Sequence, residues 1–160
     1  MNGKKVITLK PESTLEEKKE DLSLRLFVVL SKAYQAIMEQ IEQDIQSKGL
    51  NLTDFAVLEL LYHRGEQPLQ KIGQKILLTS GSITYVINKL EKKEYLYRQP
   101  CPNDRRVTYA VIAEKGKNLL DRIFPEHWGR IDELMSVLNE EEKATAIDLL
   151  KRLGTSIRKL

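Results

Sequence analysis

Residues 79–113 decide the fold, and they read TSGSITYVINKLEKKEYLYRQPCPNDRRVTYAVIA. In the first half, apolar residues recur at steps of three and four, which predicts an amphipathic helix. The second half holds two runs rich in aromatic and β-branched residues, 95–99 and 107–112, around a polar turn at Pro102-Asn103-Asp104, which predicts a β-hairpin. The apolar positions of the predicted helix are Ile83, Val86, Ile87 and Leu90.

The residues just before this stretch predict a second, shorter helix. Pro68 begins it, and Ile72, Ile76 and Leu77 face inward. Residues 77–80 then form a turn into the helix of residues 79–93, called here the recognition helix. Two short helices joined by a turn and followed by a hairpin are the layout of a winged helix-turn-helix. We therefore expect a mainly α fold with a small β-hairpin (α+β), in which the hairpin is the wing.

Longer helices are predicted on both sides of this unit. The first runs from Leu22 to Lys48, with Gly49 as its C-cap, and the next is expected to start at a Thr53 cap. After the hairpin, one helix runs through residues 114–138, and the last one starts at an Asn139–Glu142 capping pair. The last helix is expected to bury six residues: Ala146, Ile147, Leu149, Leu150, Leu153 and Ile157.

The apolar stripes of the first helix and the last two are wider than a small winged domain needs. Such stripes are ordinary core, or the two chain ends intertwine with those of a second copy. The expected organisation is a flexible tail at residues 1–20 and a winged-helix domain at 21–160. Within that domain, 51–113 form a DNA-binding lobe, and 21–50 with 114–160 form a helical dimerisation region.

Composition and charge narrow the class of protein. The chain has 160 residues, of which 41% are hydrophobic and 31% charged, and a net charge of +3. Residues 64–117 carry eleven Lys or Arg against five Asp or Glu, whereas 126–148 carry seven acids against two bases. The basic middle of the chain favours a polyanionic partner. No apolar run approaches the roughly 20 residues that cross a bilayer, and a single cysteine fits a reducing cytoplasm.

Several motifs, in order, give the chain a resemblance to a known family. They are Leu52 to Leu58 (LTDFAVL), Ser82-Ile83-Thr84 through Lys92-Lys93, Asp104-Arg105-Arg106 followed by Thr108, and Ala113-Glu114-Lys115-Gly116. Over about residues 22–157 the sequence resembles the multiple-antibiotic-resistance regulator (MarR) family of bacterial transcription factors. One departure is Glu94, where the family commonly has glycine, so a strained turn or a shifted boundary is expected there.

The resemblance implies a homodimer that binds a pseudo-palindromic operator in double-stranded DNA, usually as a repressor released by a small aromatic or phenolic ligand. Asp104 is expected to order the wing by an ion pair, since phosphates repel a carboxylate. Arg105 or Arg106 is expected to enter an A·T-rich minor groove. The residues expected to contact DNA are Ser80, Gly81, Ser82, Thr84, Tyr85, Asn88, Lys89, Lys92, Arg105 and Arg106.

An effector pocket is expected between the dimerisation helices and the DNA-binding lobe. Aromatic residues suit a phenolic ligand there, although each is individually better explained by core or interface packing. The candidates are Tyr34, Phe55, Tyr62, Phe124 and Trp128.

Catalytic and metal chemistry find little support in the sequence. There is no G-x-S-x-G motif and no phosphate-binding glycine loop. His63 and His127 are far apart in the sequence and are interpreted as structural. No metal or cofactor is therefore expected. Cys101 leaves two alternatives open, a thiol-based redox sensor or a nucleophile in a small enzyme. A winged-helix interaction module without DNA binding is a third. A cytoplasmic regulator that is not an enzyme is the leading hypothesis.

Overall fold

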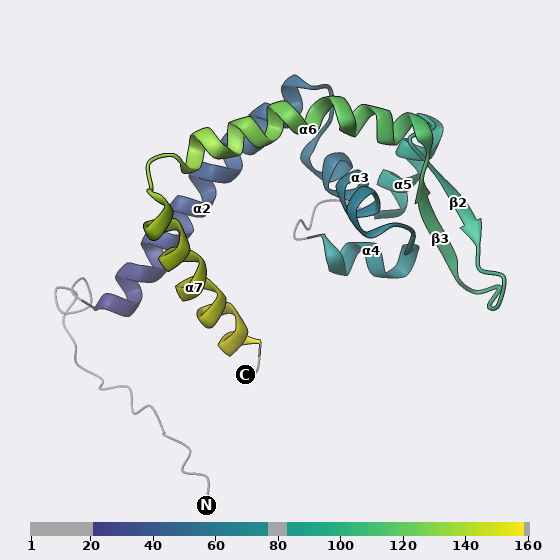
Figure 1. Cartoon of the computed structure of the whole chain (residues 1–160). Helices are drawn as coiled ribbons and strands as arrows, with labels where there is room; N and C mark the ends of the chain where they lie inside the picture. The colour runs from purple at the N-terminus through teal and green to yellow at the C-terminus, as the bar shows by residue number, and fades with distance from the viewer. Residues whose placement is uncertain (1–20, 77–82, 159–160) are drawn as a thin grey trace, which may run out of the picture. The chain divides into compact units, whose positions relative to one another are not determined.

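The computed structural model describes residues 21–76 and 83–158, so the predicted tail at 1–20 lies outside the described residues. The chain divides into two compact units, one up to Gln40 and one from Ile41 onward. The mainly helical fold with a small sheet is confirmed (Figure 1). Its elements are α2 (Leu22–Ser47), α3 (Leu52–Arg64), β1 (Gln67–Pro68), α4 (Leu69–Lys75), α5 (Ile83–Lys92), β2 (Leu96–Pro100), β3 (Thr108–Ile112), α6 (Glu114–Met135) and α7 (Glu140–Ile157).

The sheet has three strands in the order β1-β3-β2, so the expectation of a two-stranded hairpin alone was incomplete. Within the hairpin, Leu96 faces Ile112 in antiparallel register, and β1 adds a third strand through Gln67, which faces Ala110. Two residues are too few to show an alternating pattern, and Pro68 suits only a sheet edge because it cannot donate a ladder hydrogen bond. Strand β1 therefore follows from tertiary contact and not from a local signal.

One hydrophobic core joins α3, α4, α5 and the sheet to the first half of α6. Figure 1 shows α3, α4 and α5 grouped on one side of the hairpin, with α6 leaving from the end of β3. The inward faces of these elements are fully enclosed, which holds the recognition helix and the wing on one rigid body. The side chains with the least exposure are Leu58, Leu61, Ile72, Ile87, Leu90, Leu96 and Leu120.

The N-caps of α3 and α7 can be compared with the residues expected to begin these helices. Helix α3 is capped by Asn51 and not by Thr53, because the Asn51 side chain accepts a hydrogen bond from the Asp54 amide at 2.8 Å. Asparagine is at least as good a cap as threonine, and here it lies where the chain is still extended. The capping box of α7 is confirmed, since Asn139 and Glu142 each accept from the other's backbone amide.

The turn between α5 and β2 carries backbone strain at Glu94. Its φ of 62° lies in the left-handed region, and no other non-glycine among the described residues has a positive φ. The strained turn expected at this departure from glycine is therefore confirmed. The side chain also forms an exposed ion pair with Lys115 at 3.0 Å, but exposed pairs contribute little stability.

Replacing Glu94 with glycine is expected to raise the free energy of unfolding by about 0.5–1 kcal/mol, because glycine adopts positive φ without a Cβ clash. Urea unfolding followed by circular dichroism measures the change. The matched control is Glu94→Ala, which also loses the Lys115 pair but keeps the strain, and so should show no gain. Equal stability of the two variants would contradict this explanation.

Gly116, in the first turn of α6, lies where the helix passes over the start of the hairpin. A Cβ added there would lie 2.2 Å from the Tyr95 carbonyl oxygen and 3.0 Å from Ile112 Cγ1. That carbonyl is held in place because it accepts a hydrogen bond from the Ala113 amide at 2.9 Å. Only glycine therefore allows α6 to pack this closely on the hairpin.

We expect Gly116→Ala to lower the free energy of unfolding by about 2 kcal/mol, the usual cost of overpacking against an atom that cannot move. Gly129→Ala is a control in the same helix, since nothing lies within 4 Å of a Cβ added there. Gly129→Ala should instead raise the free energy of unfolding by as much as about 1 kcal/mol, because alanine has a higher helix propensity than glycine. Thermal and urea unfolding of both variants distinguish the close approach from a general effect of glycine, and similar effects in both would rule the close approach out.

The apolar stripe of the last helix, α7, was expected to be buried, but it is exposed in the chain. Within the single chain no residue of α7 is buried, so the burial expected for the six positions named above is not found there. Ile147, Leu149, Leu150, Leu153 and Ile157 are between 39% and 57% exposed. A helical stripe identifies an apolar face but not what covers it. Helix α2 likewise has a single buried residue, Ile45.

Candidate nucleic-acid interface

Helix α5 presents one face to the core and the other to solvent. Thr84, Tyr85, Asn88 and Lys92 are exposed on the outer face, with Tyr85 67% exposed. The inner positions Val86, Ile87 and Leu90 are buried. Ser80, Gly81 and Ser82, which were also expected to contact DNA, lie outside the described residues.

Lys89 differs from its neighbours because its ammonium is already paired within the chain. Its Nζ lies 2.6 Å from Asp54 Oδ1, and the Asp54 side chain is only 3% exposed. The Lys89 side chain itself is 25% exposed. Lys89 was expected to contact DNA, and no role was expected for Asp54. The available signal was an acid within the apolar start of α3, Leu52 to Leu58.

Arg98 on β2 ties the hairpin to α5. Its guanidinium donates to the Asn88 side-chain oxygen and to the Glu91 carboxylate. Its backbone amide donates to the same carboxylate at 3.1 Å. The Asn88 side-chain oxygen is therefore engaged by Arg98, which leaves the side-chain amide nitrogen of Asn88 as its other hydrogen-bonding group. In the sequence, Arg98 counted only toward the positive charge of residues 64–117. Its partners lie on another element, seven and ten positions away, and no local sequence pattern indicates such contacts.

The wing tip is organised by Asp104. Its carboxylate accepts from the Arg106 backbone amide at 3.0 Å and from the Arg106 guanidinium through both oxygens at 3.1 Å. Side-chain and then backbone hydrogen bonds from Arg106 lower the pKa of Asp104 below its usual 3.8. The Arg106 side chain is still 90% exposed, and Arg105 is also exposed. The tip therefore presents two guanidinium groups to solvent, one of them oriented by a neighbouring carboxylate.

The helix-and-wing geometry agrees with what is known of related chains. A model of the MarR family matches residues 50–108. The HTH-type transcriptional regulator MhqR of Bacillus subtilis (strain 168) is 58% identical over 136 residues, which are 85% of this chain and 94% of that protein. The chain belongs to the MarR family.

Solved structures of MarR proteins have the same winged-helix fold. AbsC, a MarR family transcriptional regulator from Streptomyces coelicolor, has a TM-score of 0.76 at 20% identity, covering 88% of this chain and 97% of AbsC. Sco3205, from the same organism and solved in complex with DNA, has a TM-score of 0.74 at 18% identity, covering 93% and 92%. Its family and its 58% identity to an HTH-type transcriptional regulator show that this MarR protein is a DNA-binding transcriptional regulator. The curated relatives are named as regulators and not as enzymes.

Four of the five aromatic residues expected at an effector pocket form one cluster of rings. Phe124 is at its centre, stacked on Trp128 at 5.2 Å and edge-on to Tyr62 at 5.0 Å and to Phe55 at 6.2 Å. Trp128 is 55% exposed, so the stack has an open face. Tyr34 lies on the part of α2 that belongs to the other compact unit.

Both histidines have structural contacts, in line with their interpretation as structural. The His63 ring packs against Phe124 at 5.2 Å, and His127 is 4% exposed with its ring 4.9 Å from Phe55. Among residues 21–76 and 83–158, no group of His, Cys, Asp and Glu side chains is placed to hold a metal ion. The same residues contain no helix long and apolar enough to span a bilayer. Cys101 is half-buried at the start of the wing loop.

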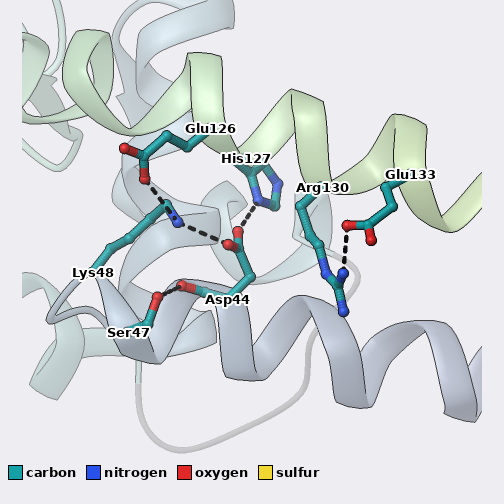
Figure 2. Close-up of polar contacts among 7 residues, drawn as sticks. All are labelled: Asp44, Ser47, Lys48, Glu126, His127, Arg130 and Glu133. Atoms are coloured by element: carbon teal, nitrogen blue, oxygen red, sulfur yellow. Dashed lines mark hydrogen bonds and ion pairs between the residues drawn. The ribbon is translucent and has the colours of Figure 1, made fainter.

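A charged network joins the end of α2 to the middle of α6 (Figure 2). The Asp44 carboxylate accepts from Lys48 Nζ at 2.7 Å and from His127 Nδ1 at 2.8 Å, and Glu126 lies 3.4 Å from the same Lys48 nitrogen. Burial opposes the charge on Asp44, but the hydrogen bonds from Lys48 and His127 outweigh burial and hold the pKa of Asp44 below 3.8. The network depends on an ionised carboxylate.

The stability that ionised Asp44 contributes should therefore be present above pH 3.8, its ordinary pKa, and be lost as the pH falls through the lower pKa of the folded state. In Asp44→Asn, the free energy of unfolding should depend less steeply on pH on the acid side. Urea titrations at a series of pH values measure that slope. Asp148→Asn, at a 71%-exposed position on α7, is the control and should keep the parent slope. An unchanged slope in Asp44→Asn would contradict the assignment.

Proposed function

We propose that this MarR protein is a homodimeric repressor that binds a pseudo-palindromic operator and is released by a small aromatic or phenolic effector. In this proposal residues 51–113 read DNA, residues 21–50 and 114–160 form the dimer, and the protein acts in the cytoplasm. The single observation that carries it is the pairing of a cationic helix-and-wing surface with an uncovered apolar face on α7.

The apolar face supports a dimer because exposed leucines and isoleucines at helical spacing are costly in water. Each such side chain gains about 1.5–3 kcal/mol when it is fully buried. In a two-fold dimer the same face is contributed twice, so a short helix supplies a large apolar area. A dimer also places two reading heads one helical turn of DNA apart, roughly 34 Å, which is the spacing a palindrome requires.

The DNA contacts divide into those that read bases and those that bind phosphates. Thr84, Tyr85 and Asn88 on α5 are the proposed base-reading groups among the described residues, because they are exposed on the outer face of the helix and carry polar atoms that can bond base edges. Lys92 is proposed to neutralise a phosphate, since it makes no ion pair within the described part of the chain. Arg105 and Arg106 are proposed to enter the minor groove.

The effector is proposed to stack on the aromatic cluster of Phe55, Tyr62, Phe124 and Trp128. Phe124 already stacks on Trp128 and contacts Tyr62 and Phe55 edge-on, and the exposed Trp128 face is open to solvent. A bound ring releases DNA only if it binds the DNA-incompetent conformation more tightly than the competent one. The hydroxyl of Tyr62, which donates to Asp121 at 2.5 Å, lies beside the ring stack and is a polar group for a phenolic ligand.

Selection of bound duplexes from a random pool tests the proposal. We expect a motif with two-fold symmetry and an affinity that falls steeply with salt. A non-symmetric motif, or binding by a monomer, would refute the palindromic part. Because the chain has one tryptophan, Trp128, quenching of its fluorescence by phenolic compounds, followed by release of labelled operator, tests the effector. Compounds that quench but do not release DNA would refute ligand-controlled release.

A further inference from the structure

We infer that Lys89 is a positioning residue: its ammonium holds the recognition helix on α3 through Asp54 and orients Tyr85, and it does not neutralise a DNA phosphate. This inference rests on the proposed function, because it concerns how α5 is presented to the operator. It assigns different roles to two lysines on the same helix, Lys89 and Lys92.

The burial of Asp54 is the first step of the argument. Its side chain is 3% exposed, and within the described residues its Oδ1 accepts no hydrogen bond, so the Lys89 ammonium at 2.6 Å is what compensates its charge. If Lys89 turned to a phosphate, a carboxylate would be left uncompensated in the protein interior. Removing one partner of a buried pair costs far more than an exposed ionic contact returns.

The position of Asp54 is fixed by the backbone. It lies in the first turn of α3, where its amide donates to the Asn51 cap at 2.8 Å. A carboxylate on the first turn of a helix is also favoured by the helix dipole. The Lys89 side chain must therefore come to Asp54, and by doing so it ties the second half of α5 to α3.

Tyr85 is the second group that Lys89 touches. The Lys89 ammonium lies 5.8 Å from the centre of the Tyr85 ring, one helical turn earlier on α5. A cation at this distance from a ring face is attracted to it. Because Tyr85 is 67% exposed on the DNA-facing side, Lys89 holds a base-reading side chain in one orientation while its own charge is turned inward.

Salt dependence separates the two lysines. Each phosphate contact contributes about 0.9 to the slope of log K against log salt, so a dimer that loses the same contact in both copies should lose about 1.8. Using an operator selected by the parent protein, we expect Lys92→Gln to show that loss. Lys89→Gln should keep the parent slope, while its affinity falls by roughly 10-fold and its preference for operator over random duplex declines. A slope that falls in Lys89→Gln as it does in Lys92→Gln overturns the inference.

Asp54 supplies an independent test, because it is too buried to meet DNA. If Lys89 is a positioning residue, Asp54→Asn should lose about as much operator preference as Lys89→Gln, and the double variant should lose no more than either single one. If Lys89 contacts a phosphate, Asp54→Asn frees its ammonium and leaves the affinity unchanged or higher, which overturns the inference. Lys89→Arg preserves the pair and should keep most of the affinity.

Two further measurements distinguish a loss of folding from a loss of operator binding. Circular dichroism melting of each variant identifies the temperature range in which all are folded, and binding is compared only in that range. If Lys89→Gln unfolds, Lys89→Arg provides the folded comparison. Loss of operator preference in a folded Lys89→Arg variant with the parent melting temperature overturns the inference. A parent protein that selects no duplex at low salt overturns the proposed function and this inference together. A parent that selects an operator, with a lowered slope in Lys89→Gln, overturns the inference alone.

Discussion

Leu150→Asp combined with Leu153→Asp is expected to convert the protein from a dimer to a monomer and to lower operator affinity by roughly 100-fold or more, because binding of two linked half-sites is lost. The two side chains are 49% and 39% exposed on α7 in the single chain. In the proposed dimer they are buried in both copies. Four leucines of interface burial would be lost, and four carboxylates would be placed in an apolar contact.

Sedimentation velocity at micromolar concentration measures the dimer, and a gel shift with the full operator measures affinity. The matched control is Lys151→Asp, which changes the chain's charge by the same amount on a different face of α7. We expect this control to remain dimeric. A variant that stays dimeric with parent affinity after both leucine changes would place the interface elsewhere.

Arg105→Ala combined with Arg106→Ala is expected to lower operator affinity by roughly 100-fold while leaving the dimer intact, since each lost groove contact costs about 1–3 kcal/mol. The structure shows both guanidinium groups exposed at the tip of the wing, with Arg106 90% exposed. Narrow A·T-rich minor grooves concentrate negative potential, and inserted arginines are stabilised there. The salt slope should also fall.

Hydroxyl-radical footprinting of the minor groove locates this effect. In the double variant, protection should disappear at the outer edges of the operator, where the wings lie, and remain at the centre of each half-site. Asp104→Asn separates orientation from charge. It keeps both arginines but removes the ion pair that orients Arg106, leaving at most neutral hydrogen bonds, so its loss of affinity should be smaller. Unchanged affinity in the double variant would remove the wing from the mechanism.

Some of the interface was predictable because its signals are local. The recognition helix follows from apolar residues at helical spacing, and the hairpin from β-rich runs on either side of a Pro-Asn-Asp turn. At Glu94, where the resemblance implied glycine, a strained turn or a shifted boundary was expected, and the φ of 62° shows the strained turn. Each of these depends on residues within a few positions of one another.

The contacts that the sequence did not reveal join residues that are distant in the chain. Strand β1, the Asp54–Lys89 pair and the Arg98 contacts with α5 join residues on different elements. Lysine on an exposed helix suggests a phosphate contact, and nothing near Lys89 in the sequence reveals a buried carboxylate 35 positions earlier. The Asp44–His127 pair, across 83 positions, was equally invisible.

The amino-acid sequence alone determined the helices, the hairpin, the basic middle of the chain and the family, because periodicity, turn chemistry and motif order are properties of neighbouring residues. Only the tertiary structure decided which charges are paired within the chain and which apolar faces remain uncovered. The physical reason is that the environment of a charged or apolar side chain is set by whatever the fold brings beside it. For Lys89 that neighbour is a buried carboxylate, whereas the rest of the described chain buries no residue of α7.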